Sequence, residues 1–410
     1  MKIAQINMLP YGSTGKIMLQ IAETARKEGH IAKSYYTVPF DKKDKRRDIE
    51  VKELYMWGTF SENRRHYYLG SLFGKNGCFS HAGTRMLIKE LKKFEPDVIH
   101  LHNLHKFCVN LPMLFKYIKK NNIRTVWTLH DCWTFTGKCP HFEMAGCDRW
   151  KTGCHNCPQL SGYPKTWTDT SKSMWRLKKK WFTGVNDMTL VTPSEWLAGL
   201  VKQSFLKDYP VRVINNGVDL SIFKPTESDF RKKYNCEGKK VLLGVAFGWG
   251  KRKGLDVFIE LSRRLDENYQ IVLVGTDENT DKMLPDNIIS IHRTQNQKEL
   301  AEIYSAADLF VNPTREDNFP TVNIEALACG TPVVTFRTGG SSEILDESCG
   351  SVVSCDDVGA MEDGVVRICN DKPYSQEACI KRAKEFDMHK KFKEYVDLYE
   401  NSSYSTECTI

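Results

Sequence analysis

The residues best suited to bind a charged ligand lie in the segment Thr314 to Val334, TREDNFPTVNIEALACGTPVV. Its polar loop carries three charged residues, Arg315, Glu316 and Asp317. A helix is predicted to begin near Pro320, and a helix start offers amide donors and a positive partial charge to a phosphate. Glu325, about five residues into that helix, can accept hydrogen bonds from a sugar diol. The alternative, that the acids only cap the helix, explains one acid and not the whole segment.

A second loop, GWGKRKG from Gly248 to Gly254, concentrates positive charge after a predicted strand, Lys240 to Ala246. Arg252 and Lys253 can stabilise a departing diphosphate, whose negative charge matters most in the transition state. The glycine spacing could instead indicate a dinucleotide site, but no acid for a ribose stands at the expected place downstream. We therefore interpret this stretch as a phosphate-binding loop.

An insertion-like segment at residues 132–180 is rich in cysteine, with Cys132, Cys139, Cys147, Cys154 and Cys157. Cys154 and Cys157 form a C-x-x-C pair that can clamp a tetrahedral ion, and Cys139 and Cys147 can supply the other two ligands. We predict a structural zinc site at these four positions. Unlinked reduced thiols, and redox or iron–sulfur chemistry, are the alternatives.

Alternating strand-like and amphipathic stretches must position these residues. The alternation runs from Lys2 to Asn215 and restarts at Lys240, and 410 residues exceed what one core usually holds. The predicted fold class is α/β, with two doubly wound parallel sheets, Rossmann-like, facing across a cleft. We expect an N-terminal domain at 1–222 that contains the insertion at 132–180, and a C-terminal domain at 223–386. A helix and tail at 387–410 should pack back towards the N-terminal domain.

These motifs together resemble the retaining glycosyltransferase family 4, the group 1 glycosyltransferases of bacterial surface polysaccharide synthesis, which have the GT-B fold. That family has two carboxylates eight positions apart before a Cys-Gly-x-Pro-Val-Val type strand, and Asp317 and Glu325 match them. The resemblance extends from the first strand to the last helix. It implies that residues 223–386 bind a nucleotide sugar and that residues 1–222 form the acceptor side.

The resemblance also implies roles for single residues of the acidic segment. Glu325 would hold the nucleotide ribose. Asp317 stands where the family usually has Glu, and either Asp317 or the neighbouring Glu316 would contact the transferred sugar. Asn318 and Phe319 of the same loop would complete this part of the donor site.

Outside that segment, Lys253 matches the lysine with which the family neutralises the donor diphosphate. The family's arginine position holds Gly248, so Arg252 is the nearest substitute. His130, at the end of a predicted strand, is similar to a histidine that touches the transferred sugar. Catalytic roles are thus expected for His130, Asp317 and Lys253. Three glycines would let the backbone approach the donor, although the first could simply form a tight turn: Gly15, Gly339 and Gly340.

The activity that the resemblance implies is retaining transfer from a nucleotide diphosphate sugar to a hydroxyl of a sugar or of a lipid-linked oligosaccharide. A UDP-sugar is expected as donor, with a GDP-sugar as the second candidate. The sequence has no Asp-x-Asp, so we expect no catalytic metal and assign its task to cationic side chains. A two-domain nucleotide-sugar epimerase, and a non-catalytic basic protein that binds lipid or nucleic acid, are the alternatives.

The net charge of +8 is concentrated in basic runs, among them Lys42 to Arg47 and SMWRLKKKWF at Ser173 to Phe182. Such runs fit a solvated face, or an anionic membrane surface that carries a lipid-linked acceptor. No apolar run is long enough to span a membrane, and the first residues lack the layout of a secretory signal. We therefore expect a cytoplasmic protein with peripheral contact at the inner face of the cell membrane, and no nucleic-acid partner.

Overall fold

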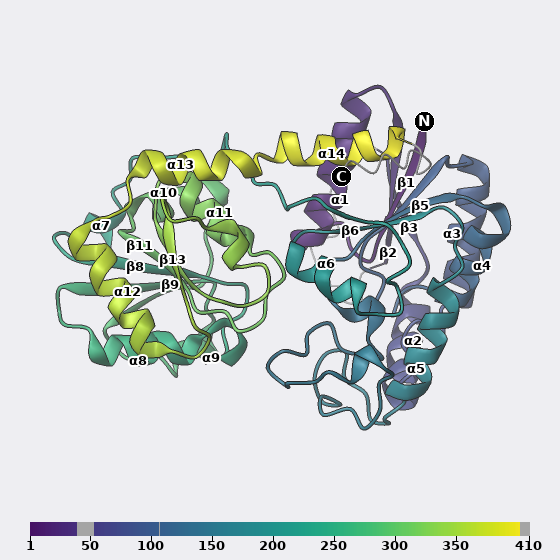
Figure 1. Ribbon diagram of the computed structural model, residues 1–410, viewed down its shortest axis with the longest axis horizontal. Coiled ribbons are helices and arrows are strands. Elements are labelled where there is room, and N and C mark those ends of the chain that lie inside the picture. The colour runs from purple at the N-terminus through teal and green to yellow at the C-terminus, as the bar shows by residue number, and fades with distance from the viewer. Residues whose placement is uncertain (39–52, 106, 402–410) are drawn as a thin grey trace, which may run out of the picture. The chain divides into compact units, whose positions relative to one another are not determined.

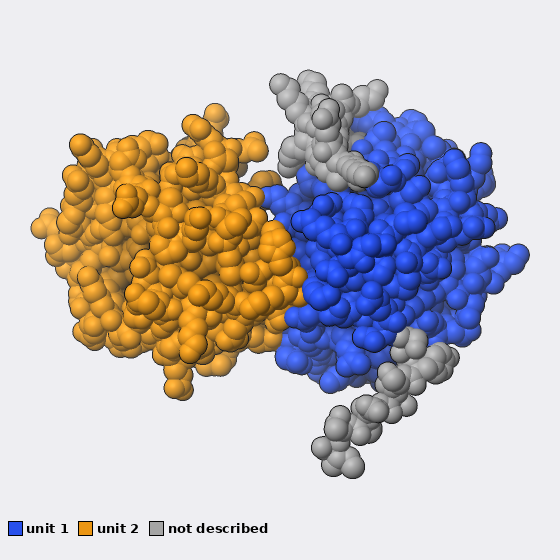
Figure 2. Space-filling model, turned by 90° about the horizontal axis from the view of Figure 1, so that it is seen from above, with its two compact units in different colours: residues 1–214, 392–410 blue, residues 215–391 orange. Residues whose placement is uncertain are grey.

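A computed structural model describes residues 1–38, 53–105 and 107–401 of the chain (Figure 1). The chain forms two compact units (Figure 2): unit 1 holds residues 1–214 and the chain from Phe392 onward, and unit 2 holds Asn215–Lys391. This division falls earlier than the expected boundary after residue 222. The basic run Lys42 to Arg47 and the tail beyond residue 401 lie outside the described residues.

A parallel sheet forms the centre of unit 1. Its described strands follow the order β3-β2-β1-β4-β5-β6-β7, with bounds β1 Lys2–Asn7, β2 Ile31–Thr37, β3 Leu54–Trp57, β4 Val98–Leu101, β5 Arg124–Thr128, β6 Met188–Thr192 and β7 Val211–Val213. Each of these strands pairs in parallel with its neighbours. Strands β4 and β6 are buried along their whole length, as expected of a parallel sheet covered on both faces.

The helices of unit 1 are α1 Gly12–Lys27, α2 Phe60–Phe73, α3 His81–Phe94, α4 Leu111–Asn121, α5 Ser171–Phe182 and α6 Glu195–Lys202. Three of them begin at a side-chain cap, provided by Thr59, Asn110 and Ser194. Aromatic rings hold α4 and α5 to the sheet: the Phe182 centroid lies 4.7 Å from that of Phe115 and 4.9 Å from that of Trp127. The insertion before α5 is mostly irregular, with short 3-10 turns at Trp133–Phe135 and Arg149–Lys151.

Unit 2 is a second parallel α/β sheet. Its described strands follow the order β10-β9-β8-β11-β12-β13, with bounds β8 Lys240–Val245, β9 Tyr269–Val274, β10 Ile288–Ile291, β11 Leu309–Asn312, β12 Val333–Phe336 and β13 Gly350–Val353. Its helices are α7 Phe230–Lys233, α8 Leu255–Arg264, α9 Glu278–Asp281, α10 Gln297–Ala306, α11 Thr321–Ala328, α12 Val358–Asp371 and α13 Gln376–Ala383. Helices α10, α11 and α13 lie on one side of the sheet, and α8 and α12 on the other (Figure 1), so each face has its own apolar layer. The prediction of two parallel α/β sheets is confirmed.

The last helix, α14 Met388–Glu400, joins both units. Its first residue donates a backbone hydrogen bond to Val218 of unit 2 at 3.0 Å. In unit 1 the guanidinium of Arg124 donates to the carbonyls of Leu398 and Tyr399, both at 2.8 Å, and so satisfies the end of the helix. Across the described residues, we find no helix with the length and apolar character that a membrane crossing requires.

Candidate functional site

Three loops of unit 2 follow its central strands β8, β11 and β12 and hold the residues that the sequence analysis singled out. Strands β8 and β11 are neighbours, and the strand order changes direction between them. Open parallel sheets bind ligands outside the carboxyl ends of the strands at such a switch point. Residues 246–254 and 313–320 therefore occupy the place where a ligand is expected.

Arg315 locks the first two loops together. Its guanidinium donates to both carboxylate oxygens of Asp256, at 2.8 and 2.9 Å, and to Asp356 at 2.5 Å. Its backbone N–H donates to the carbonyl of Arg252 at 2.9 Å. The Arg315 side chain is only 7% exposed, whereas those of Asp256 and Asp356 are 50% and 63% exposed, so a buried guanidinium ties the loops to two carboxylates at the surface.

Lys253 and Asp317 form an ion pair, with Nζ 2.5 Å from Oδ2. Their side chains are 18% and 21% exposed, so both retain access to a ligand. Arg252 donates to the backbone carbonyl of Glu316 at 3.0 Å, and Glu316 itself is buried. Of the two acids considered for the first carboxylate, Asp317 is the one that the structure pairs with the candidate phosphate lysine.

Glu325 lies in the second turn of α11, which begins directly after Pro320. The buried hydroxyl of Tyr304, from α10, donates to Oε2 of Glu325 at 3.1 Å. Desolvation, and secondly the nearby Glu325 carboxylate, raise the pKa of Tyr304 well above its usual value, so the hydroxyl stays a donor at neutral pH. One carboxylate oxygen is thereby fixed, while the Glu325 side chain remains partly exposed.

Gly339 and Gly340 bring the third loop against the second. A Cβ at Gly339 would stand 1.7 Å from the carbonyl oxygen of Asp317, and the residue has a φ of +51°. The N–H of Gly340 donates to the carbonyl of Asn318 at 3.0 Å. Glycine is therefore required at 339 for the close approach of two backbones, and both glycines lie beside the loop that carries Asp317.

Two of the predicted donor-binding residues are held by packing. The ring of Phe319 is buried, 5.7 Å from the ring of Phe386, so its side chain belongs to the core of unit 2. In unit 1, a Cβ at Gly15 would stand 2.5 Å from the carbonyl carbon of Pro10 and 2.8 Å from the carbonyl oxygen of Leu9. Glycine at 15 thus lets the start of α1 pack on the preceding turn, whether or not a ligand binds there.

His130 ends a chain of hydrogen bonds in unit 1. Its Nε2 lies 3.1 Å from Nδ1 of His102, whose own Nε2 lies 2.7 Å from the side-chain oxygen of Gln5. The Gln5 amide donates to the hydroxyl of Tyr399 at 3.3 Å, and that hydroxyl lies 2.6 Å from Nδ1 of His100. The chain therefore connects the carboxyl end of β5 with helix α14.

Burial keeps these imidazoles neutral. Desolvation lowers the pKa of His130 to about 4 and lowers the pKa values of His100 and His102 well below 6.5. Because the Gln5 oxygen accepts, the proton of His102 sits on Nε2, so His102 accepts at Nδ1 and His130 donates from Nε2. Nδ1 of His130 is thus unprotonated, which suits it to accept a hydrogen bond from a hydroxyl group.

A second polar cluster in unit 1 was not predicted from the sequence. Nε2 of His105 lies 3.0 Å from Oδ2 of Asp131, and its Nδ1 lies 3.1 Å from the hydroxyl of Tyr163. Burial raises the pKa of Asp131, but the opposing effect of His105 and of hydrogen bonds is larger, and the net pKa is lowered. Position in the sequence could have indicated this cluster, because His105 follows closely after β4 and Asp131 follows closely after β5.

The four cysteines predicted to bind zinc line one small cavity of about 20 Å³ in the insertion. All four are free thiols, and burial raises the pKa of Cys139 to about 12 and that of Cys154 to about 11. In the described part of the chain, no three His, Cys, Asp or Glu side chains form a group that could hold a metal ion as they stand. The zinc site therefore stays a prediction.

Two parallel-sheet units, with a cationic loop and two carboxylates at a switch point, define a glycosyltransferase of the GT-B class. The chain matches the family model described as Glycosyltransferase Family 4 over residues 15–222 and the model described as Glycosyl transferases group 1 over residues 226–386. It belongs to glycosyltransferase family 4, as the resemblance indicated.

Individual relatives agree with this placement. The chain is 28% identical over 273 residues to the putative colanic acid biosynthesis glycosyl transferase WcaC of Escherichia coli, covering 64% of this chain and 65% of WcaC. It is 24% identical over 177 residues to the D-inositol 3-phosphate glycosyltransferase of Mycolicibacterium smegmatis, covering 40% and 41%. Both matches thus cover less than two thirds of the relative.

Solved structures share the fold. Sucrose-phosphate synthase of Thermosynechococcus elongatus superposes with a TM-score of 0.73 at 17% identity, over 97% of this chain and 98% of that one. HepE of Anabaena, in complex with UDP, superposes with a TM-score of 0.69 at 15% identity, over 98% and 100%. The GT-B fold prediction is confirmed.

Proposed function

We propose that this protein is a retaining, metal-independent glycosyltransferase that moves a sugar from a UDP-sugar to a hydroxyl of a sugar acceptor. The observation that carries the proposal is the Lys253–Asp317 ion pair, which joins the loops after β8 and β11 at the switch point, with Glu325 in the helix that follows β11. A nucleotide sugar requires a cation for its diphosphate and acceptors for its hydroxyls. The UDP and UDP-glucose complexes of HepE support a uridine donor, with a GDP-sugar as the second candidate.

Each side chain has a defined task in this proposal. Glu325 accepts hydrogen bonds from the ribose, and Asp317 accepts them from the transferred sugar. Lys253 stabilises the charge that develops on the departing diphosphate as its bond to the sugar breaks, while Arg252 holds the loop through the Glu316 carbonyl. The acceptor oxygen bonds to the sugar on the face that the diphosphate leaves, and the departing phosphate takes the acceptor proton.

A thermal-shift screen with UDP-, GDP- and ADP-sugars tests the donor, since a ligand that binds the folded state raises its melting temperature. We expect a rise with a UDP-sugar and none with an ADP-sugar. Stabilisation by none of the three would contradict the proposal. Incubation with the donor alone distinguishes the epimerase alternative, because a transferase leaves the sugar configuration unchanged without an acceptor. Activity should persist without added divalent cations.

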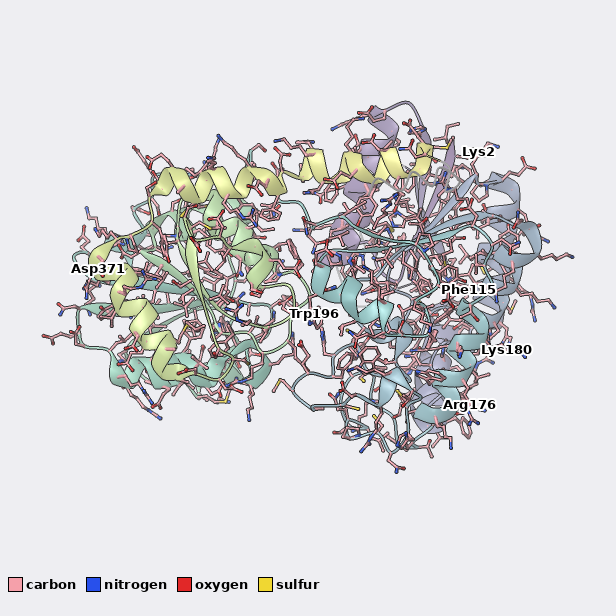
Figure 3. The ribbon with its side chains drawn as sticks, viewed as in Figure 1. Lys2, Phe115, Arg176, Lys180, Trp196 and Asp371 are labelled. Carbon is pink, nitrogen blue, oxygen red and sulfur yellow. The ribbon has the colours of Figure 1, made fainter. Side chains whose placement is uncertain are left out.

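We propose that the acceptor is a lipid-linked oligosaccharide of cell-surface polysaccharide assembly and that unit 1 contacts an anionic membrane. The similarity to WcaC, named for colanic acid biosynthesis, supports the pathway. A groove of about 420 Å³ between α4 and α5 supports the membrane contact; it is lined by Pro112, Phe115, Lys116, Lys119, Lys120, Lys180 and Trp181. Figure 3 shows Phe115 on α4 and Lys180 on α5. Exposed lysines beside an indole suit phosphate headgroups.

Vesicle flotation tests this contact. The protein should float with vesicles that contain phosphatidylglycerol and stay behind with pure phosphatidylcholine, and replacing Lys116, Lys120 and Lys180 with alanine should abolish flotation. Three exposed lysines elsewhere in unit 1, Lys89, Lys92 and Lys93 of α3, provide a control with the same change in charge. Equal loss in both triple variants would show that net charge, and not this groove, directs binding.

A further inference from the structure

The cysteine-rich insertion is built from tight turns that bring four distant thiols to one place. Gly146 and Gly153, directly before Cys147 and Cys154, have positive φ values of 55° and 135°, and Asn156 inside the C-x-x-C pair has a φ of 44°. Arg149 holds the C-x-x-C turn by donating to the backbone carbonyls of His155, at 3.2 Å, and Asn156. The turns are therefore fixed by backbone conformation and not only by the thiols.

The cavity that these thiols line, together with residues that include Lys138, Arg149 and His155, is large enough for an ion. The cavity that they line measures about 20 Å³, slightly more than the roughly 10–15 Å³ that one water-sized sphere needs. A tetrahedral zinc ion has Zn–S distances of about 2.3 Å, which places its sulfur ligands about 3.8 Å apart. The described side chains do not form such a group as they stand. Binding of an ion therefore requires cysteine side chains to rotate on a backbone that is already folded.

One hydrogen bond already reaches a thiol, and another fixes the backbone beside a second one. The backbone N–H of Gly137 donates to Sγ of Cys154 at 3.1 Å. A Cβ at Gly137 would stand 2.4 Å from the carbonyl oxygen of Ser171, so only glycine lets this N–H come so close. The N–H of Cys157 donates to Asp169 at 2.8 Å, which fixes the second half of the C-x-x-C pair. Such outer contacts orient metal ligands and stabilise their charged form.

Two buried lysines supply compensating charge. Lys178 donates to the carbonyls of Trp133 and Thr136 at 2.6 and 3.1 Å. Lys138 donates to the carbonyls of Gln159 and Gly162, both at 2.7 Å. A zinc ion with four thiolates carries two net negative charges, and Lys138 and Lys178 are buried cationic side chains of the same segment.

We propose that Cys139, Cys147, Cys154 and Cys157 bind one zinc ion in a closed, structural site. Four thiolates leave no open position for water or substrate, so the ion takes no part in glycosyl transfer. The site instead ties together an irregular segment that has little secondary structure of its own.

The ion also supports the polar cluster of unit 1. Lys138 contacts the carbonyl of Gly162, the residue before Tyr163, and the Tyr163 hydroxyl contacts His105. The chain from Cys157 to Tyr163 is thus anchored at one end by the ion and at the other by His105. Loss of the ion should release Tyr163 while leaving the donor loops of unit 2 intact.

Elemental analysis of tag-free, full-length protein is the direct test. We expect about one zinc per chain in the wild type and less than about a tenth of that in a Cys154→Ser, Cys157→Ser variant. Cys132→Ser is the matched control, because Cys132 belongs to the same insertion but is not among the described residues that line the cavity; it should retain the ion. Iron with labile sulfide, absence of any metal, or disulfides between these cysteines would each overturn the proposal.

A measurement on the wild-type protein tests the proposal even if the cysteine variants fail to fold. Titration with an organomercurial, which blocks thiolates, should release one zinc ion, detected with a chromogenic chelator, as four thiols react. The released protein should still bind UDP with an affinity within about twofold of the starting value, whereas transfer should fall. Zinc content is independent of activity, so failure of the proposed transferase function would leave this test intact. Release of zinc without consumption of the four thiols would contradict the ligand assignment.

Discussion

Replacing Tyr304 with phenylalanine should weaken donor binding through Glu325. The substitution removes only the hydroxyl that donates to Oε2 at 3.1 Å. The ring contacts with Phe310 and Phe223, at centroid distances of 5.5 and 6.2 Å, can be kept by phenylalanine. Tyr304 is therefore expected to act as a positioning residue for the carboxylate, without contact to the nucleotide.

The size of the effect follows from the hydrogen bond. Bonds to charged groups contribute about 1.5–3 kcal/mol, and the lower end applies here because Glu325 is partly exposed. If the binding free energy of UDP loses between half and all of about 1.5 kcal/mol, the Kd for UDP rises roughly three- to tenfold. Isothermal titration calorimetry measures this change directly.

A double-mutant cycle separates positioning from general damage. In a Glu325→Ala background, Tyr304→Phe should leave the Kd for UDP unchanged, because the carboxylate that it orients is gone. The melting temperature without ligand reports any loss of packing. The reasoning is refuted if Tyr304→Phe weakens UDP binding equally with and without Glu325, or if it has no effect on the intact site.

Three further outcomes are expected. Lys253→Ala should lower kcat roughly 100- to 1,000-fold, as loss of one transition-state donor does, whereas Lys251→Ala, the same charge change at an exposed side chain of the same turn, should retain activity. Asp317→Asn should reduce kcat more than Glu316→Gln, because Asp317 pairs with Lys253 and Glu316 is buried; the opposite order would assign the first acid to Glu316. Burial lowers the pKa of His66 to about 3, so the unfolded state takes up its proton first. In urea unfolding, the contribution of His66 to the free energy of unfolding should be fully present above pH 6.5 and should decline as the pH falls towards 4. The decline should be shallower in a His66→Gln variant.

The sequence predicted the sheets well where apolar runs are short and clearly bounded. The strand predicted at Lys240 to Ala246 is β8, which ends one residue earlier, at Val245. The start of α11 near Pro320 was also recognisable, because proline and the polar loop mark it. Strands β2 and β3 were not predicted, since Lys33 and Ser34 interrupt the apolar run of β2 and β3 is only four residues long.

Site residues were predictable where one segment carries them and not where distant segments meet. Asp317 and Glu325 share one strand–loop–helix segment, so their resemblance to the family's pair of carboxylates could be recognised within one stretch of sequence. The role of Arg315 depends on Asp356 and Asp256, which lie 41 and 59 positions away, and no local pattern reveals such a contact. The proton position on His130 likewise depends on Gln5 and His102, which only the folded sheet brings into line.

The chain passes between the two units twice, after Ile214 and after Lys391, and the second passage lies inside α14. The two units are thus linked by two stretches of chain, and the second of these is helical. Helix α14 is continuous from Met388 to Tyr399. Tyr399 is part of the hydrogen-bond chain that ends at His130. One helix therefore contains the second passage between the units and also a member of the hydrogen-bond chain that ends at the imidazole we expect to contact the sugar.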